Sequence, residues 1–62
     1  MKMKIYYHVI EENTHDRIAS RGYYTQRADA EKEVDRLSLL FPGLHFYVYE
    51  TNSKKEPTIV TI

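Results

Sequence analysis

The sequence predicts an α+β fold with the element order ββαββ, in which one helix packs on one face of a four-stranded antiparallel sheet. Residues 3–10 and 44–50 alternate along the chain as half-buried strands do, with a period of two. Residues 26–41 instead repeat apolar side chains at helical spacing. The chain has 62 residues, which is the size of one small domain, and we assign residues 1–62 to it.

The segment before the helix predicts a β-hairpin. In residues 3–10, β-branched and aromatic side chains favour a pleated, half-buried strand. The polar residues 11–16 contain Asn and Asp, which stabilise turns by bonding to their own backbone. Residues 17–24 predict the second strand, with Gly22 at a bulge or a close backbone approach.

Residues 26–41 predict the helix. Thr25 is the expected N-cap, because its hydroxyl can accept a bond from a free backbone N–H. Pro42 prevents extension, because it disfavours a helical residue before it and lacks an N–H. The apolar positions between them form one helical stripe that consists of Ala30, Val34, Leu37 and Phe41.

Two strands are predicted after the helix, at residues 44–50 and 58–62, with a polar loop between them. One helix covers only one face of one sheet. We expect the spatial order 2-1-3-4, with the helix crossing over the sheet. In the alternative order, the third strand lies beside the second.

The sheet face that the helix leaves open is the predicted binding surface. If Ile5, Val9 and Val48 lie under the helix, the intervening side chains point to the opposite face. This face is rich in Tyr, His and Arg, and Tyr and Arg are enriched at binding hot spots. The alternative is that the tyrosines are ordinary strand residues in cross-strand pairs. The predicted site consists of Tyr6, His8, Arg21, Tyr23, His45, Tyr47 and Tyr49.

The composition argues against several classes of function. Nine Lys and Arg balance nine Asp and Glu, so there is no basic excess of the kind that drives nucleic-acid binding. The chain has no cysteine for a disulfide or a thiolate zinc site, and its three histidines lack the spacing of metal ligands. No nucleophile elbow or phosphate-binding loop occurs. We therefore expect no enzyme, no cofactor and no metal.

The hydrophobic pattern predicts no targeting or membrane segment. The polar and aromatic side chains that follow Ile5 interrupt the apolar stretch that a signal peptide would need. No apolar run approaches the roughly 20 residues of a membrane span. We expect a cytoplasmic protein that makes no membrane contact.

The order and composition of the elements predicted in residues 5–50 resemble those of a known group of proteins. These residues combine a tyrosine-rich opening strand, a short helix that ends at Phe-Pro and an aromatic strand after it. These features are carried by Tyr24-Thr25, Ala30-Glu31, Val34, Arg36-Leu37, Phe41-Pro42 and Phe46-Tyr47-Val48-Tyr49-Glu50. In them the chain is similar to short accessory proteins of tailed bacteriophages whose function is uncharacterised. The resemblance implies a protein that acts on a host or phage macromolecule by binding, and it implies no catalytic residue.

Together, these observations predict a non-catalytic protein-binding module. It would use the open Tyr/His/Arg face of its sheet or an exposed strand edge, and its partner is another protein or a second copy in a homodimer. The alternative function is single-stranded nucleic-acid binding, with bases stacked on the same aromatic face. His8 and His45, if adjacent on paired strands, would repel each other when protonated near pH 6, which predicts weaker association there.

Overall fold

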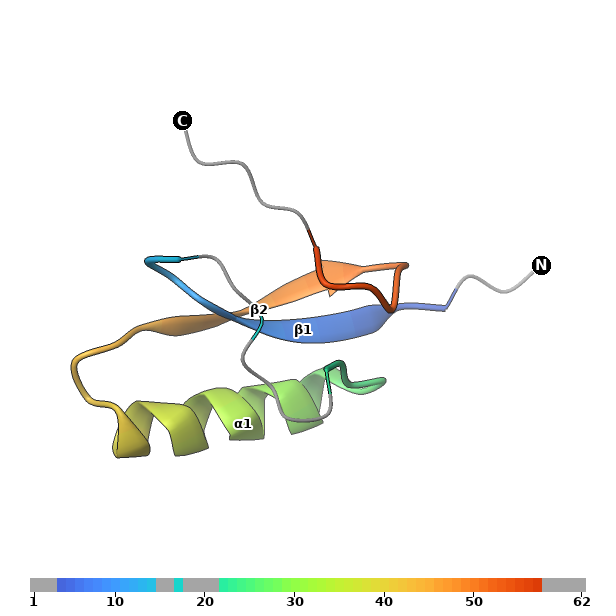
Figure 1. Ribbon diagram of the computed structural model, residues 1–62. Helices are drawn as coiled ribbons and strands as arrows, with labels where there is room; N and C mark the ends of the chain where they lie inside the picture. The colour runs from blue at the N-terminus through green and yellow to red at the C-terminus, as the bar shows by residue number, and fades with distance from the viewer. Residues whose placement is uncertain (1–3, 15–16, 18–21, 58–62) are drawn as a thin grey trace.

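The computed structural model describes residues 4–14, 17 and 22–57. These residues form strand β1 (Tyr6–Glu11), helix α1 (Arg27–Leu40) and strand β2 (Phe46–Thr51). The two strands pair in an antiparallel sheet, and α1 lies along one face of it (Figure 1). The α+β class is therefore as predicted.

The predicted four-stranded sheet is wrong, because the sheet that the described residues form has two strands. The described part of the predicted second strand makes only two isolated bridges to β1, which join Tyr7 to Tyr24 and Ile10 to Arg17. Gly22 has a φ of +86°, in the left-handed region that a β-strand does not use, so regular pairing does not extend through this residue. Residues 18–21 lie outside the described residues.

β1 is the inner strand of this arrangement. Its register with β2 runs from Tyr6 opposite Thr51 to Glu11 opposite Phe46. The first and third predicted strands are therefore neighbours, and the alternative that placed the third strand beside the second is wrong. The predicted fourth strand, residues 58–62, lies outside the described residues.

α1 occupies nearly the predicted range. Its N-cap is Gln26, with φ −124° and ψ 133°, and no side chain makes a capping hydrogen bond, so the predicted Thr25 cap is wrong. The last extended residue before the helix lies one position later than expected. At the other end, the N–H of Phe41 donates to the carbonyl of Leu37 at 2.8 Å, and Pro42 follows in the turn towards β2.

The core lies between α1 and the sheet. The predicted helical stripe contributes Ala30, Val34 and Leu37 to it, whereas Phe41 is largely exposed because it follows the last helical residue. The sheet contributes alternate residues of both strands, as period-two alternation requires. The buried members are Val9, Tyr24, Ala30 and Leu37, and the half-buried members are Tyr7, Val34, Phe46 and Val48.

Candidate functional site

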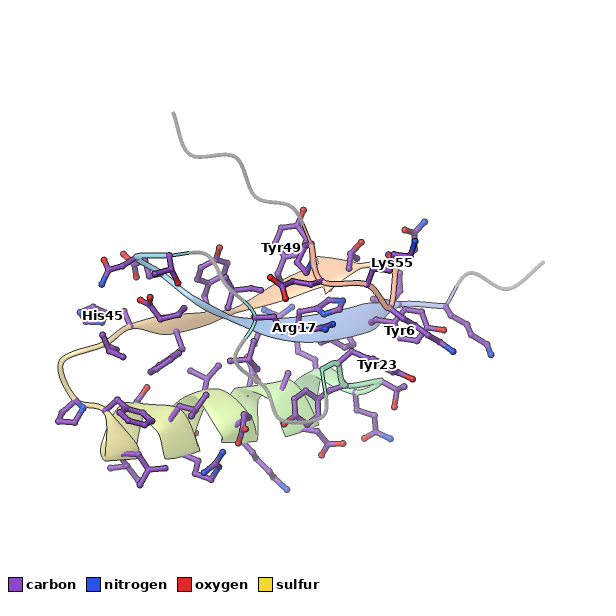
Figure 2. All side chains as sticks on the ribbon, in the orientation of Figure 1. Tyr6, Arg17, Tyr23, His45, Tyr49 and Lys55 are labelled. Atoms are coloured by element: carbon purple, nitrogen blue, oxygen red, sulfur yellow. The ribbon has the colours of Figure 1, made fainter. Side chains whose placement is uncertain are left out.

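The register places four predicted binding residues on the sheet face away from α1. His8 stands opposite Tyr49, and Val9 stands opposite Val48. Residues directly opposite each other share a face, and the two valines belong to the core under α1. Figure 2 shows Tyr49 projecting away from the helix. The face away from α1 therefore carries Tyr6, His8, Tyr47 and Tyr49.

The β1 half of this face is covered, which corrects the expectation of an open surface. The exposed fraction is 0% for His8 and 7% for Tyr6. His8 Nδ1 lies 3.1 Å from the carbonyl oxygen of Gly22, and Nε2 lies 2.8 Å from the carbonyl oxygen of Ser53. The chain therefore closes over His8 from both sides, and this side chain is structural.

Arg17 helps to hold this cover in place. Its guanidinium donates from Nη1 to the carbonyl of Lys54 at 3.2 Å, and Nε lies 4.0 Å from the carboxylate of Glu56. Figure 2 shows Arg17 in front of β1. The alternation rule could not find this cover, because residues distant in the sequence form it.

The structure separates the two histidines that were expected to interact. The residue opposite His8 is Tyr49, while His45 precedes β2 and is exposed. The carbonyl of His45 accepts a bond from the N–H of Glu12 at 2.8 Å, and Glu12 lies four residues after His8, just beyond the end of β1. The predicted adjacency is wrong because β2 pairs in a different register, and the pH effect that depended on it has no basis. Arg21 lies outside the described residues.

Tyr6 and Tyr23, both predicted binding residues, meet at one end of the sheet (Figure 2). Their ring centroids are 5.2 Å apart at an interplanar angle of 84°, an edge-to-face contact. The ammonium of Lys54 lies 5.7 Å from the Tyr6 centroid and 5.9 Å from the Tyr23 centroid, which is cation–π range. The sequence did not indicate Lys54, because a polar loop gives no sign of where it folds back.

A concavity of about 430 Å³ opens beside these two rings. It has two lysines and no carboxylate in its lining, so its electrostatic character is cationic. The lining residues are Lys4, Ile5, Tyr6, Tyr23, Thr25 and Lys54.

The outer edge of β2 presents backbone hydrogen-bonding groups. Tyr7, opposite Glu50, exchanges both of its backbone bonds with Tyr24 at 2.8 Å, on the side of β1 away from β2. Residues of an antiparallel pair alternate between bonding inwards and pointing outwards. Phe46, Val48 and Glu50 therefore direct their N–H and C=O groups away from β1, and in the described part of the chain these groups have no hydrogen-bond partner.

Side chains flank this edge on both faces of the sheet. Tyr47 is half-buried and Tyr49 is exposed. Burial raises the pKa of the Tyr47 phenol above its ordinary value, with smaller contributions from Tyr49 and Glu12. On the helix face, a concavity of about 470 Å³ lies between α1 and β2 and is lined by Arg27, Glu31, Val34, Asp35, Tyr47 and Val48.

A separate apolar surface surrounds the C-terminal end of α1. Leu39 is 85% exposed, and three further large apolar side chains near it are also exposed. An apolar group of this kind is a second place where a macromolecule could bind. The other three residues are Leu40, Phe41 and Leu44.

Within residues 4–14, 17 and 22–57, no three His, Asp or Glu side chains gather as a metal site requires. In the same part of the chain, no helix is long and apolar enough to cross a membrane. Comparisons with protein-family models, curated proteins and solved structures gave no match. The resemblance to short phage proteins therefore stays a prediction, and any proposal for function depends on the geometry of this chain.

Proposed function

We propose that this chain is a non-catalytic protein-binding module that accepts an extended segment of its partner along the outer edge of β2. The observation that carries the proposal is the row of outward N–H and C=O groups at Phe46, Val48 and Glu50. An exposed edge is a template for an added strand, whose main-chain bonds supply affinity. The flanking side chains supply specificity.

The composition of β2 also supports strand addition. Natural sheet edges are commonly protected by Lys or Pro, and residues 46–51 contain neither. The one charged residue is Glu50, whose carboxylate oxygen lies 3.5 Å from Nη1 of Arg27 in its own chain. Tyr47 and Tyr49, two of the predicted binding residues, flank the edge, and the concavity between α1 and β2 can receive a side chain of the added segment.

Replacing Val48 by proline tests the proposal. Val48→Pro removes the central outward N–H, while the inward bonds made by Tyr47 and Tyr49 remain, since proline is tolerated at a strand edge that faces solvent. Val48→Ala is the matched control, because it shortens the side chain and keeps the N–H. Glu50→Pro with its control Glu50→Ala repeats the test if circular dichroism shows that Val48→Pro is unfolded.

The measurement is phage display of random peptides on the immobilised wild-type chain. We expect enriched peptides to bind Val48→Ala slightly more weakly than wild type, and to bind Val48→Pro about ten-fold more weakly than Val48→Ala, as the loss of one or two buried hydrogen bonds implies. Hydrogen exchange at Phe46, Val48 and Glu50 should slow when peptide is bound. Failure to enrich any peptide, or equal binding to the folded proline variant, contradicts strand addition.

Single-stranded nucleic acid is a second candidate ligand, favoured by the cationic concavity beside Tyr6 and Tyr23. Lys4 and Lys54 offer ammonium groups to phosphates, and the half-buried ring of Tyr23 offers a surface on which a base can stack. This contact lies at the end of the sheet, because Tyr6 and His8 are covered on its face.

Fluorescence anisotropy of a labelled oligothymidine tests this second candidate. Lys54→Gln should weaken binding several-fold and reduce its salt dependence, whereas Lys55→Gln, a loop lysine outside the concavity lining, should change it little. Absence of binding at low ionic strength would eliminate the candidate.

A further inference from the structure

We infer that the strand added to β2 is β2 of a second copy of this chain, in a symmetric antiparallel dimer with its two-fold axis at Val48. The inference rests on the proposed function and names its partner. A two-fold interface joins the same patch of both copies, so the patch must be complementary to itself. Backbone register, side chains and charge each meet that requirement.

The backbone of β2 is complementary to itself in one register. A two-fold axis at Val48 places Val48 opposite Val48 of the partner subunit, and Phe46 opposite Glu50 of the partner subunit. All three outward residues of each copy then lie in hydrogen-bonded pairs, because the alternation is the same on both sides. A shift of the axis by one residue along β2 moves one outward residue of each copy beyond the end of the partner strand.

The side chains on both faces match in this register. On the face away from α1, Tyr47 stands opposite Tyr49 of the partner subunit, and the symmetry creates this aromatic pair twice. These positions are non-hydrogen-bonded pairs, in which opposite side chains are closest. On the helix face, Val48 meets Val48 of the partner subunit at the border of the core.

The charges beside β2 are also complementary. Arg27, at the start of α1, lies near Glu50, at the end of β2, so the helix and the strand run in opposite directions. The row of charges beside β2 on α1 is positive at Arg27 and negative at Glu31 and Asp35. The two-fold axis reverses this row in the second copy, which directs Arg27 towards the acidic end of the opposing row. Because the formal net charge of each chain is zero, two copies do not repel each other through their overall charge.

Sedimentation equilibrium and isotope-filtered NMR test the inference on the full chain. We expect a species of twice the 7.4 kDa chain mass at high concentration. In a mixture of labelled and unlabelled chains, we expect an intermolecular NOE between the Hα atoms of Tyr47 and Tyr49. Within one chain these atoms are two residues apart along an extended strand, so the filtered signal reports the register itself.

Variants assign the dimer to this surface. Val48→Ala keeps the N–H but shortens the Val48 pair, so it should weaken dimerisation only slightly, whereas Val48→Pro should weaken it about ten-fold more than Val48→Ala does. Glu50→Pro with Glu50→Ala repeats the comparison if the first variant is unfolded. Leu39→Lys changes the exposed apolar end of α1 and should leave the dimer unchanged. A dimer that Leu39→Lys abolishes and folded Val48→Pro preserves overturns the inference.

The remaining outcomes separate this inference from the proposed function. A chain that stays monomeric at every concentration, while displayed peptides still bind at β2, overturns the dimer and leaves strand addition standing. A monomeric chain that also selects no peptide overturns both.

Discussion

His8 is fully buried, and its two ring nitrogens lie within hydrogen-bond distance of two backbone carbonyls, those of Gly22 and Ser53. A carbonyl oxygen only accepts a hydrogen bond, so the tautomer of the ring decides which of the two nitrogens donates. A residue predicted to bind a partner instead holds two loops against the sheet.

Removing the His8 side chain should destabilise the fold. His8→Ala leaves the carbonyls of Gly22 and Ser53 without the ring that contacts them, and it leaves a cavity in a fully buried position, so we expect the free energy of unfolding to fall by about 2–4 kcal/mol. His45→Ala, at an exposed position, should change it by less than about 0.5 kcal/mol. Urea denaturation of both variants measures the difference, and equal effects would contradict the structural role of His8.

Glu33 is a second residue that stabilises the fold. Its side chain is 9% exposed, and its two carboxylate oxygens accept from Nε and Nη2 of Arg36 at 2.6 and 2.8 Å. The bond from Arg36 lowers the pKa of Glu33 below its ordinary value of 4.5, the charge of Arg36 and the Tyr24 phenol add to this effect, and burial opposes it. Folding therefore favours the ionised carboxylate.

This lowered pKa predicts acid sensitivity. The stabilisation from Glu33 is fully present above the ordinary pKa of 4.5 and is lost as the pH falls through the lower pKa of the folded state. We expect the free energy of unfolding to decrease below about pH 4.5, and to decrease less in Glu33→Gln. Urea titrations across this range check the expectation, with exposed Glu31→Gln as control. Identical pH slopes in Glu33→Gln and wild type would refute it.

At the scale of the element, α1 was the most predictable part of the chain. A stripe of apolar side chains at helical spacing identifies a helix and its buried face without knowledge of its neighbours. The cap was less predictable, because it depends on the dihedral angles of one residue. The carbonyl of Gln26 accepts from the N–H groups of Asp29 and Ala30, but no side chain caps the free donors of the first turn.

A better N-cap should therefore stabilise the protein. Gln26→Asp supplies a carboxylate acceptor at a position whose dihedral angles already suit a cap, and its charge complements the helix dipole. We expect a gain of about 0.5–1.5 kcal/mol in the free energy of unfolding. Thr25→Ala should have little effect. Thermal denaturation measures both, and a larger loss from Thr25→Ala than gain from Gln26→Asp would restore Thr25 as the cap.

For the strands, the sequence identified the faces but not what covers them. Alternation correctly assigned Val9 and Val48 to the helix face and Tyr49 to the other face. It could not show that Tyr6 and His8 are covered, because their contacts are with Gly22, Tyr23 and the loop of Ser53 and Lys54, which are distant in the sequence. Period-two patterns report the direction of a side chain and carry no information about distant loops.

At the scale of the whole molecule, the described residues form a thin two-layer unit, one helix on two strands (Figure 1). The number of strands was mispredicted because β-propensity does not show whether a segment bonds along its length or touches at single bridges. A sheet of two strands has marginal stability without further packing. Association along β2 would double the number of strands without changing the fold of either copy.

The dimer predicts a stability that depends on concentration. When association stabilises the folded state, the midpoint of thermal unfolding rises with chain concentration by mass action. We expect this rise in wild type and Val48→Ala, and its absence in Val48→Pro. Differential scanning calorimetry over a hundred-fold range of chain concentration measures this rise. A hundred-fold change in concentration alters the free energy of unfolding that is linked to association by about 2.7 kcal/mol. A midpoint independent of concentration in wild type would argue for a monomer.

The position of β1 has a consequence for how this chain tolerates change. Five of its six side chains are buried and the other is half-buried, whereas no side chain of β2 is buried. In a library that contains every substitution at every position, the fold should therefore tolerate few substitutions at any position of Tyr6–Glu11. β2 should accept polar replacements at several positions. Diversity can accumulate on the outer strand while the inner strand stays constant, so new recognition properties can arise without loss of the scaffold.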